Sequence, residues 1–322
     1  TLNRLLDTSA LADGVLDLVM EDVVPLVVDV STMVSEAERL LNQPLDIVVH
    51  DPVTGDRVTW SAPPEEWARW LTAEADTGQP TGLVLSVNPD AVTAYLQRQA
   101  DAILDPSRYL NPEEVVVTIR ESLAAGEPAG VARVYHHDRQ HVVSAGESLI
   151  SIAWDYGVPY PWLQQANPGL GSLAVGQTIT IPSPDNFLEF PVVWDKRVVI
   201  SISQQHAWVY ENGDLRWDWT ISTGIADSPT WPGIYQIISH VPNAYAANWN
   251  LYMPYFMGVY RPIPGADFTN GFHGFPTRGG SQLLWTNSLG TRVTYGCILL
   301  SNQNAEALYN WAENGVVVEI QA

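Results

Sequence analysis

The first third of the chain alternates between helical and strand patterns of apolar residues. In 88–104, Val92, Tyr95, Leu96 and Gln99 recur at helical spacing and predict a helix. Similar patterns predict helices at 35–43 and 63–74 and strands at 44–51 and 57–61. Residues 1–134 are therefore predicted to form an α+β module, and no catalytic pattern stands out in it.

A compact pattern follows at 141–182. The residues "HVV" (141–143) predict a short strand, and an apolar stripe from Leu149 to Tyr156 predicts a helix that Gly157 ends. Pro161 is expected to start a second short helix, and "TITIP" closes the segment with a strand. This order predicts a small β-α-α-β domain over 141–185. The polar residues 135–140 before it are expected to be a linker, whose histidines lack the ligand spacing of a structural zinc site, so no metal is expected.

Residues 187–322 are mainly β in pattern. Asn212-Gly213 lies between two alternating runs and predicts a tight hairpin. Residues 233–241 predict another strand, and 316–320 predict the last one. A helix is expected between Ser301 or Asn302, as its cap, and Gly315, as its stop. The fold class is thus multidomain, with a mainly-β barrel or sandwich and one late helix at its C-terminal end.

Charge and hydropathy narrow the possible partners. The 322 residues carry 36 acidic and 15 basic side chains, for a formal net charge of −21. Such a chain repels phosphate backbones and anionic headgroups, so no nucleic-acid partner is expected.

No run of eighteen apolar residues occurs, which argues against a membrane-spanning helix. The first residues show no signal-peptide pattern, so either the protein is cytoplasmic or a leader was removed.

The chain has one cysteine, Cys297, within "TRVTYGCILL" (291–300). A free cysteine is most often a small buried hydrophobe, and it is a nucleophile only where a base lies near it. Three histidines occur in the last segment. His206 and His240 have ordinary strand contexts, whereas His273 lies between glycines in "NGFHGFP", which are expected to leave space around its imidazole. Spacing alone leaves both readings of Cys297 open.

The segment 141–182 carries the residues of a known module. Its "GESLISIAWDYGV", "LQQAN" and "VGQTITIP" resemble the LysM domain along its whole length. The resemblance implies binding to glycans that contain N-acetylglucosamine, such as peptidoglycan or chitin. The contacts would fall on two loops, at Gly146, Glu147 and Ser148 and at Asn167 and Pro168.

The last segment resembles the L,D-transpeptidase (YkuD-type) catalytic domain over about 195–322. The resemblance rests on "ISISQQHAWVYENG", "STG" (222–224), "TWPGIYQI" (230–237) and "FHG…LG…TYGCILL". More loosely, residues 20–134 are similar to the peptidoglycan-binding module that often precedes this domain. The expected domains are therefore 1–134, a 135–140 linker, LysM at 141–185 and a catalytic domain at 187–322.

The resemblance also implies roles for single residues. Cys297 would be the nucleophile and His273 its base, with the second ring nitrogen of His273 oriented by the carbonyl of Gly274. Backbone amides near Gly296 and Cys297 would stabilise the oxyanion. No cofactor is implied.

Two positions depart from the family pattern. Tyr295 stands where the family has a histidine, and a phenol cannot be a base at neutral pH, although it can donate a hydrogen bond. Leu299 stands where arginine or asparagine is usual. Arg292 is a hypothetical substitute for that arginine, with Thr294 and Tyr255 as further substrate-binding residues. The residues "PTRGGSQ" (276–282) look like an insertion between His273 and Cys297.

The implied function is L,D-transpeptidation of peptidoglycan stem peptides, giving 3→3 cross-links, with carbapenems as expected acylating agents. Two alternatives stay open: an L,D-carboxypeptidase that uses water as the acceptor, and an inactive wall-binding protein. The expected partner is peptidoglycan, and the oligomeric state is left undetermined. The expected location is the cell envelope or outside the cell, with a leader or anchor removed.

Overall fold

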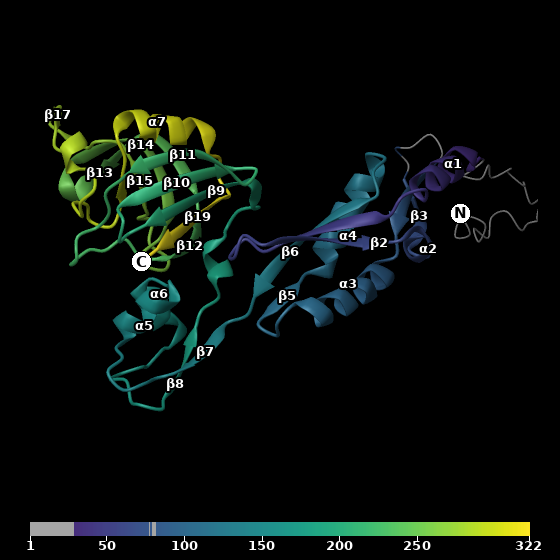
Figure 1. The fold of residues 1–322 in the computed structure, drawn as a ribbon, viewed down its shortest axis with the longest axis horizontal. Coiled ribbons are helices and arrows are strands. Elements are labelled where there is room, and N and C mark those ends of the chain that lie inside the picture. The colour runs from purple at the N-terminus through teal and green to yellow at the C-terminus, as the bar shows by residue number, and fades with distance from the viewer. Residues whose placement is uncertain (1–28, 77, 79–81) are drawn as a thin grey trace, which may run out of the picture.

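The computed structural model describes residues 29–76, 78 and 82–322. Three parts follow one another along the chain (Figure 1), and we name them by position: the N-terminal module (29–136), the βααβ unit (139–182) and the β domain (187–322). The N-terminal module extends away from the other two, which lie against each other. The predicted domain at 1–134 includes residues that lie outside the described ones.

The N-terminal module is the expected α+β fold. Its elements are α1 (Ser31–Leu40), β1 (Leu45–His50), β2 (Arg57–Ala62), α2 (Pro64–Trp67), β3 (Leu71–Ala75), β4 (Leu83–Val87), α3 (Pro89–Ile103), β5 (Arg108–Leu110), α4 (Pro112–Ala124) and β6 (Ala129–His136). Four strands form a sheet in the order β2-β1-β6-β5, and β3 pairs with β4 as a separate hairpin. Trp67, Tyr95 and Ile119 are buried in its core.

The helix predicted at 63–74 is shorter than expected. It ends at Trp67, and residues from Leu71 onward form β3, which pairs with β4 from Leu71↔Val87 to Ala75↔Leu83. The segment has helix-forming residues, but the pairing partner lies beyond the reach of a local pattern. Tertiary pairing therefore overrides the local preference.

The βααβ unit has the predicted order, with β7 (Arg139–Val142), α5 (Leu149–Tyr156), α6 (Tyr160–Ala166) and β8 (Thr178–Ile181). Ser148 caps α5 by accepting a hydrogen bond from the Ser151 amide, and Gly157 ends α5 in the left-handed region. Residues 135–140 were expected to be a linker, but the structure shows that β6 runs through His136 and β7 starts at Arg139. Only residues 137 and 138 lie between the two strands.

Two packed sheets build the β domain after a short 3₁₀ helix, η3 (Pro184–Phe187). The first has the order β11-β10-β9-β19-β12, and the second has the order β17-β16-β14-β15-β18, with β13 on β14. The bounds are β9 (Val193–Ser201), β10 (His206–Glu211), β11 (Asp214–Thr220), β12 (Gly233–Gln236), β13 (Ser239–Ala246), η4 (Ala247–Trp249), β14 (Leu251–Tyr260), β15 (Asn270–His273), β16 (Thr277–Arg278), β17 (Ser281–Gln282), η5 (Thr286–Ser288), β18 (Ile298–Leu299), α7 (Asn302–Trp311) and β19 (Val316–Gln321).

The strand predicted at 233–241 is two strands in two sheets. β12 pairs with β19, and the chain then crosses to the second sheet, where β13 pairs with β14. Ile237 and Ile238 lie at this crossing and are both buried, so an unbroken apolar run marks a passage between sheets. The late helix is α7, capped by Ser301 as expected, and it ends at Trp311, before Gly315.

The βααβ unit and the β domain share one hydrophobic core. Ile152 and Leu163 of the unit belong to the same buried cluster as Tyr235 and Phe272 of the β domain. The indole N–H of Trp162 donates to the carbonyl of Arg261 at 2.7 Å. The unit is therefore packed into the β domain and not held only by the chain connection.

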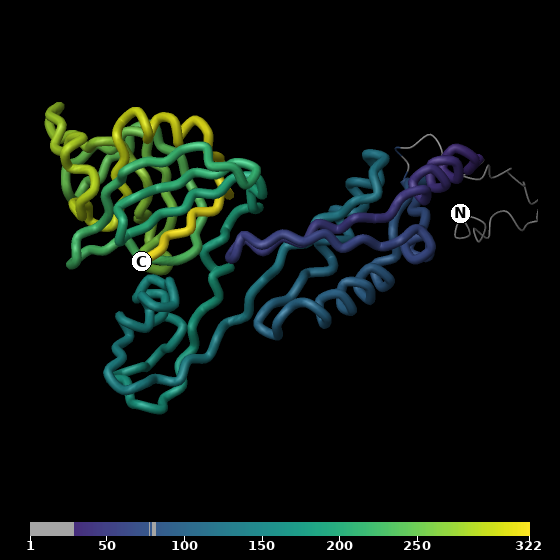
Figure 2. Tube along the Cα trace, viewed as in Figure 1, coloured from purple at the N-terminus to yellow at the C-terminus, as the bar shows by residue number. Residues whose placement is uncertain are grey.

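The N-terminal module touches the β domain through the turn between β1 and β2. In Figure 2 this turn, in purple, reaches the green and yellow chain of the β domain. Arg197 of β9 donates to the carbonyls of Pro52 and Val53 at 2.9 and 3.1 Å, and the ring of His50 packs edge-on against Trp194. These contacts bind the turn to the first sheet.

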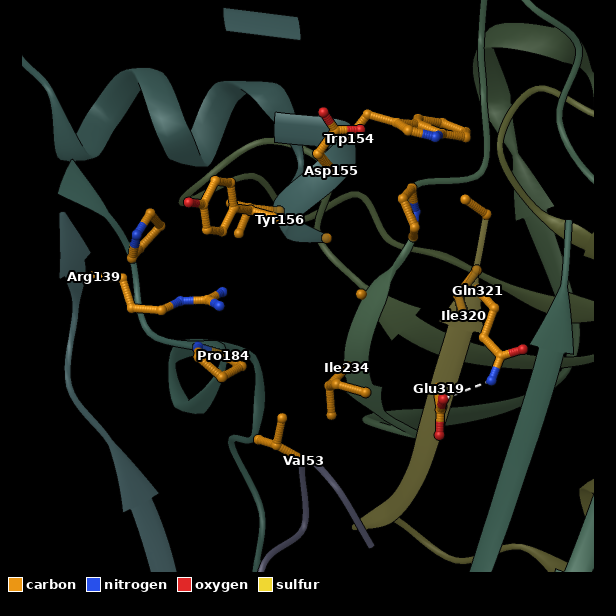
Figure 3. Close-up of a pocket in the computed structure, with 16 residues that line it drawn as sticks. Val53, Arg139, Trp154, Asp155, Tyr156, Pro184, Ile234, Glu319, Ile320 and Gln321 are labelled. Carbon is orange, nitrogen blue, oxygen red and sulfur yellow. Dashed lines mark hydrogen bonds between the residues drawn. The ribbon is translucent and has the colours of Figure 1, made fainter. Parts of the chain in front are cut away.

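A cleft of about 440 Å³ lies where the three parts meet (Figure 3). The guanidinium of Arg139 reaches into it between Tyr156 and Pro184, and Val53 and Ile234 lie across from them. No described helix is long and apolar enough to cross a membrane.

Candidate active site

Two short strands bring the expected nucleophile and base together. His273 ends β15, and Cys297 immediately precedes β18, which runs parallel to β15 with Phe272 opposite Ile298. Both side chains line one cavity of about 250 Å³. The rest of its wall is largely apolar and consists of Ala246, Trp249, Leu251, Met253, Phe268, Pro276, Arg278, Leu283, Leu284, Val293, Thr294 and Tyr295.

His273 is held in one orientation by the backbone. Its Nδ1 lies 2.7 Å from the carbonyl oxygen of Gly274, as the resemblance implies. Because a carbonyl only accepts, Nδ1 carries the hydrogen and Nε2 carries the free lone pair. Burial lowers the pKa of His273 to about 4, and the bond to Gly274 opposes this shift. The imidazole is thus neutral at neutral pH, with its free lone pair on Nε2.

The thiol of Cys297 is also neutral in this structure. Burial raises its pKa to about 11, against a smaller lowering by a backbone hydrogen bond from Gly271. Its Sγ lies 3.7 Å from Oδ1 of Asn270, a weak contact in which the thiol donates. The resting pair is therefore thiol and imidazole, and no ion pair is formed in advance.

A buried polar network surrounds the thiol, and the sequence patterns did not reveal it. The amide of Asn270 donates to the hydroxyl of Tyr260 at 3.2 Å, and this hydroxyl also accepts from the Trp231 backbone N–H at 3.0 Å. Gly296 adopts φ +102°, and a Cβ there would lie 2.5 Å from Nδ2 of Asn270. Glycine at 296 is therefore needed for the backbone of this segment to approach Asn270.

Two threonines fix the backbone carbonyls next to the thiol. The hydroxyl of Thr294 donates to the carbonyl of Cys297 at 2.6 Å, and that of Thr230 donates to the carbonyl of Gly296 at 3.0 Å. Thr294 also lines the cavity, so the residue expected to bind substrate has a structural task as well.

The other histidines of the β domain are engaged elsewhere. His206 pairs with Asp218 at the edge hairpin, and the ring of His240 contacts the Ala312 carbonyl and Asn314. Neither lines the cavity, so His273 is the one described histidine that does. Among the described residues, no group of three histidine, cysteine, aspartate or glutamate side chains is arranged to hold a metal ion.

Comparison with known families identifies two parts of the chain. Residues 195–320 match the L,D-transpeptidase catalytic domain (YkuD), and residues 141–182 match the LysM domain. The chain carries a LysM domain followed by a YkuD-type L,D-transpeptidase domain.

The chain is also similar to individual proteins. The chain is 28% identical over 180 residues to the Bacillus licheniformis protein named "Putative L,D-transpeptidase YkuD". The aligned residues make up 55% of this chain and 96% of that protein. Among solved structures, an L,D-transpeptidase from Stackebrandtia nassauensis is 21% identical and covers 41% of this chain and 58% of its own, with a TM-score of 0.32. An L,D-transpeptidase from Enterococcus faecium is 14% identical, with 90% and 100% coverage and a TM-score of 0.36. The chain thus spans a little over half of the first of these structures and all of the second.

Tyr295 is part of the cavity wall and is largely exposed. Its side chain is 57% exposed, and its ring stacks on Trp249 with centroids 6.2 Å apart. Trp249 in turn lies 6.1 Å from Phe268. Tyr295 therefore belongs to an aromatic group at the cavity, whereas His273 is the one histidine among the described residues of the cavity wall.

The arginine at the cavity is Arg278, and not Arg292. The side chains of Arg278 and Arg292 are both exposed, but only Arg278 is part of the cavity wall. Leu299 is fully buried within β18. Arg278 belongs to the segment 276–282, which looks like an insertion in the sequence. That insertion is the sequence feature that could have pointed to Arg278 as a residue of the cavity.

Tyr255 lies outside the cavity of the transpeptidase domain. Its hydroxyl interacts with Glu306 of α7, its ring meets Tyr309 edge-on at 5.9 Å, and its φ is +54°. The side chain packs on α7, so its expected contact with substrate has no support from its position.

The LysM loops combine open positions with structural ones. Glu147 accepts from the Ser144 amide and contacts the ring of His141, and Ser148 caps α5. Asn167 donates to the Leu163 and Thr180 carbonyls and accepts from the Thr180 amide. Gly146 and Pro168 remain open at the surface. The side chains of Glu147, Ser148 and Asn167 thus serve the fold of the LysM domain.

Proposed function

We propose that the chain is a cysteine-nucleophile L,D-transpeptidase that joins peptidoglycan stem peptides by 3→3 links. The observation that carries this proposal is the placement of Cys297 and His273 in one cavity, with Nδ1 of His273 bound to the Gly274 carbonyl. Nε2 is then the base available to the thiol.

The proposed reaction has two halves. Nε2 of His273 takes the thiol proton as Sγ of Cys297 attacks the carbonyl of the third stem residue. The bond to the terminal D-alanine breaks, and its amine leaves with the proton from His273, which leaves a thioester on Cys297. A side-chain amine of a second stem then attacks the thioester and gives a proton to His273. The C–S bond breaks as the new amide forms, and His273 returns the proton to sulfur, which restores the thiol.

The neutral resting pair suits this sequence. A thiol with a pKa of about 11 and an imidazole with a pKa of about 4 keep their proton on sulfur until a carbonyl is in place. Proton transfer then accompanies attack. Backbone N–H groups of Gly296 and Cys297 are the proposed oxyanion donors, a contribution of roughly 3–4 kcal/mol per donor in comparable sites.

The LysM domain is proposed to bind the glycan strands to which these stems are attached. We propose from this that the chain acts at the cell wall, outside the cytoplasmic membrane. The N-terminal module is proposed as a further peptidoglycan-binding part.

Product analysis tests the function. The purified chain is incubated with a disaccharide tetrapeptide, and the products are separated and weighed, with Cys297→Ala as the control. A dimer that has lost one D-alanine, absent with Cys297→Ala, is the expected result. Tripeptide and free D-alanine without dimer would instead identify an L,D-carboxypeptidase. No conversion would favour the wall-binding protein.

A further inference from the structure

The cavity at Cys297 has a single fixed charge. Among the described residues of its wall, Arg278 is the one arginine or lysine, and no aspartate or glutamate is present. Cys297 and His273 are both neutral at neutral pH, whereas a guanidinium is always protonated. An apolar cavity with one cation is unexpected in a chain of net charge −21, because acidic side chains are far more numerous than basic ones.

The position of Arg278 is fixed by the backbone. It ends β16, whose Thr277 pairs with Tyr252 of β14. Its Nη2 donates to the carbonyl of Trp249 at 2.9 Å, which ties the guanidinium to the aromatic group formed by Trp249, Phe268 and Tyr295. No carboxylate of the described residues forms an ion pair with Arg278, unlike Arg120, which pairs with Glu74. Of its five N–H donors, one is used in this way and the others can take a ligand.

We propose that Arg278 binds a free carboxylate of the peptide substrate beside the thiol. This rests on the proposed function, and it assigns the anion contact to a residue of the inserted segment. Leu299 cannot make such a contact because it is buried and apolar, and Arg292 is not part of the cavity wall. A guanidinium pairs with a carboxylate in a two-point geometry, which also orients the peptide on Sγ.

Alkylation of the thiol tests this without requiring turnover. Cys297 is the only cysteine of the chain, so the mass of the full-length protein reports on this site alone. Iodoacetate and iodoacetamide have nearly the same shape and differ in charge. We expect Arg278→Ala to lower the ratio of the iodoacetate rate to the iodoacetamide rate by about threefold to tenfold, since an exposed ion pair is partly screened.

Arg292→Ala is the matched control, because it removes the same charge from a nearby exposed position outside the cavity. It should leave the ratio close to that of the unchanged protein. Equal ratios for all three proteins would overturn the proposal. Equal reductions in both variants would also overturn it, because they would indicate a general effect of net charge.

Two carboxylates of a stem could be the ligand, and peptide substrates separate them. In a tetrapeptide the terminal carboxylate, or the side-chain carboxylate of the third residue, is replaced by a carboxamide. Amidation of the carboxylate that Arg278 binds should lower kcat/KM about tenfold in the unchanged protein and much less in Arg278→Ala. If each amidation lowered kcat/KM as much in Arg278→Ala as in the unchanged protein, the proposal would be wrong, whereas failure of the proposed function would appear as no turnover of any peptide.

Discussion

At the scale of single residues, the chemistry depends on how His273 and Cys297 are buried. Burial removes water from both groups and favours the uncharged form of each. It lowers the pKa of His273 and raises the pKa of Cys297. The proposed catalytic pair therefore differs from a preformed thiolate–imidazolium pair. Its reactivity depends on proton transfer from the thiol to His273 during attack. The pH dependence of acylation should therefore follow the protonation of His273.

The rate of acylation by a carbapenem should stay level from pH 7 down to about pH 5. The base must be unprotonated, and the pKa of His273 is lowered from 6.5 to about 4, so protonation removes the base only below that range. The measurement is the acylation rate against pH, followed by protein mass. A midpoint near pH 6.5 would contradict the burial of His273.

The hydroxyl of Tyr260 should support the reactivity of the thiol through Asn270. Tyr260→Phe leaves the Trp231 N–H and the Asn270 amide without their acceptor, at a cost of about 1–3 kcal/mol in the free energy of unfolding. We also expect slower acylation and a changed pH profile, because Asn270 contacts Sγ of Cys297.

Tyr235→Phe is the control for Tyr260→Phe. Tyr235 is buried, stacks on Tyr260 and donates its hydroxyl to the Pro232 carbonyl. It should lose similar stability in thermal unfolding yet keep the acylation rate. If both variants slowed acylation equally, the hydroxyl of Tyr260 would have only a structural role.

At the scale of elements, the contact between α5 and β12 joins the LysM and transpeptidase domains. Gly157 ends α5 at φ +67°, and Gly233 begins β12 at φ +147°. A Cβ on Gly233 would lie 2.3 Å from the carbonyl of Gly157 and 2.6 Å from the hydroxyl of Tyr235. The two backbones can meet here only because both residues are glycine.

Gly233→Ala should destabilise the protein by more than about 2 kcal/mol, because a backbone atom blocks the new methyl group. Gly176→Ala is the control, since Gly176 also has a positive φ, of +84°, but open space around it. That change should cost only the left-handed strain of about 1–2 kcal/mol. Thermal unfolding measures both, and equal losses would show that the domain contact contributes little.

At the scale of the whole molecule, ionic contacts link the N-terminal module to the segment that enters the transpeptidase domain. The ring of His136, at the end of β6, lies 3.3 Å from Asp51 and 3.4 Å from Asp185 of η3. Arg108 pairs with Asp51, and Arg133 pairs with Asp185. Burial opposes the charged imidazole, but the hydrogen bonds and charges of the two aspartates prevail and raise the pKa of His136 to about 9.

This shift predicts a loss of stability in mild alkali. Because the folded pKa of His136 exceeds the unfolded value of 6.5, its contribution is complete below pH 6.5 and disappears as the pH rises through 9. The unfolding temperature should fall over this window by more in the unchanged protein than in His136→Gln. Parallel curves for the two proteins would contradict the assignment.

What the sequence predicted well was local or carried by family motifs. Helix α3, the Asn212-Gly213 hairpin and the LysM order follow from spacing and turn chemistry, and the meeting of Cys297 with His273 follows from the resemblance. The partners Asn270, Tyr260 and Trp231 come from three separate segments and could not be joined by any local pattern. Arg292 was favoured because it is near Cys297 in sequence, but the fold brings Arg278 to the cavity instead. Linear distance is a poor guide where loops cross between strands.

The most direct test of the central claim is the mass of the intact protein after incubation with a carbapenem. Our account predicts one adduct on the unchanged protein, none on Cys297→Ala, and strongly slowed formation on His273→Ala. An adduct that persists in Cys297→Ala, or no adduct on a folded unchanged protein, would contradict the assignment of Cys297 as the nucleophile.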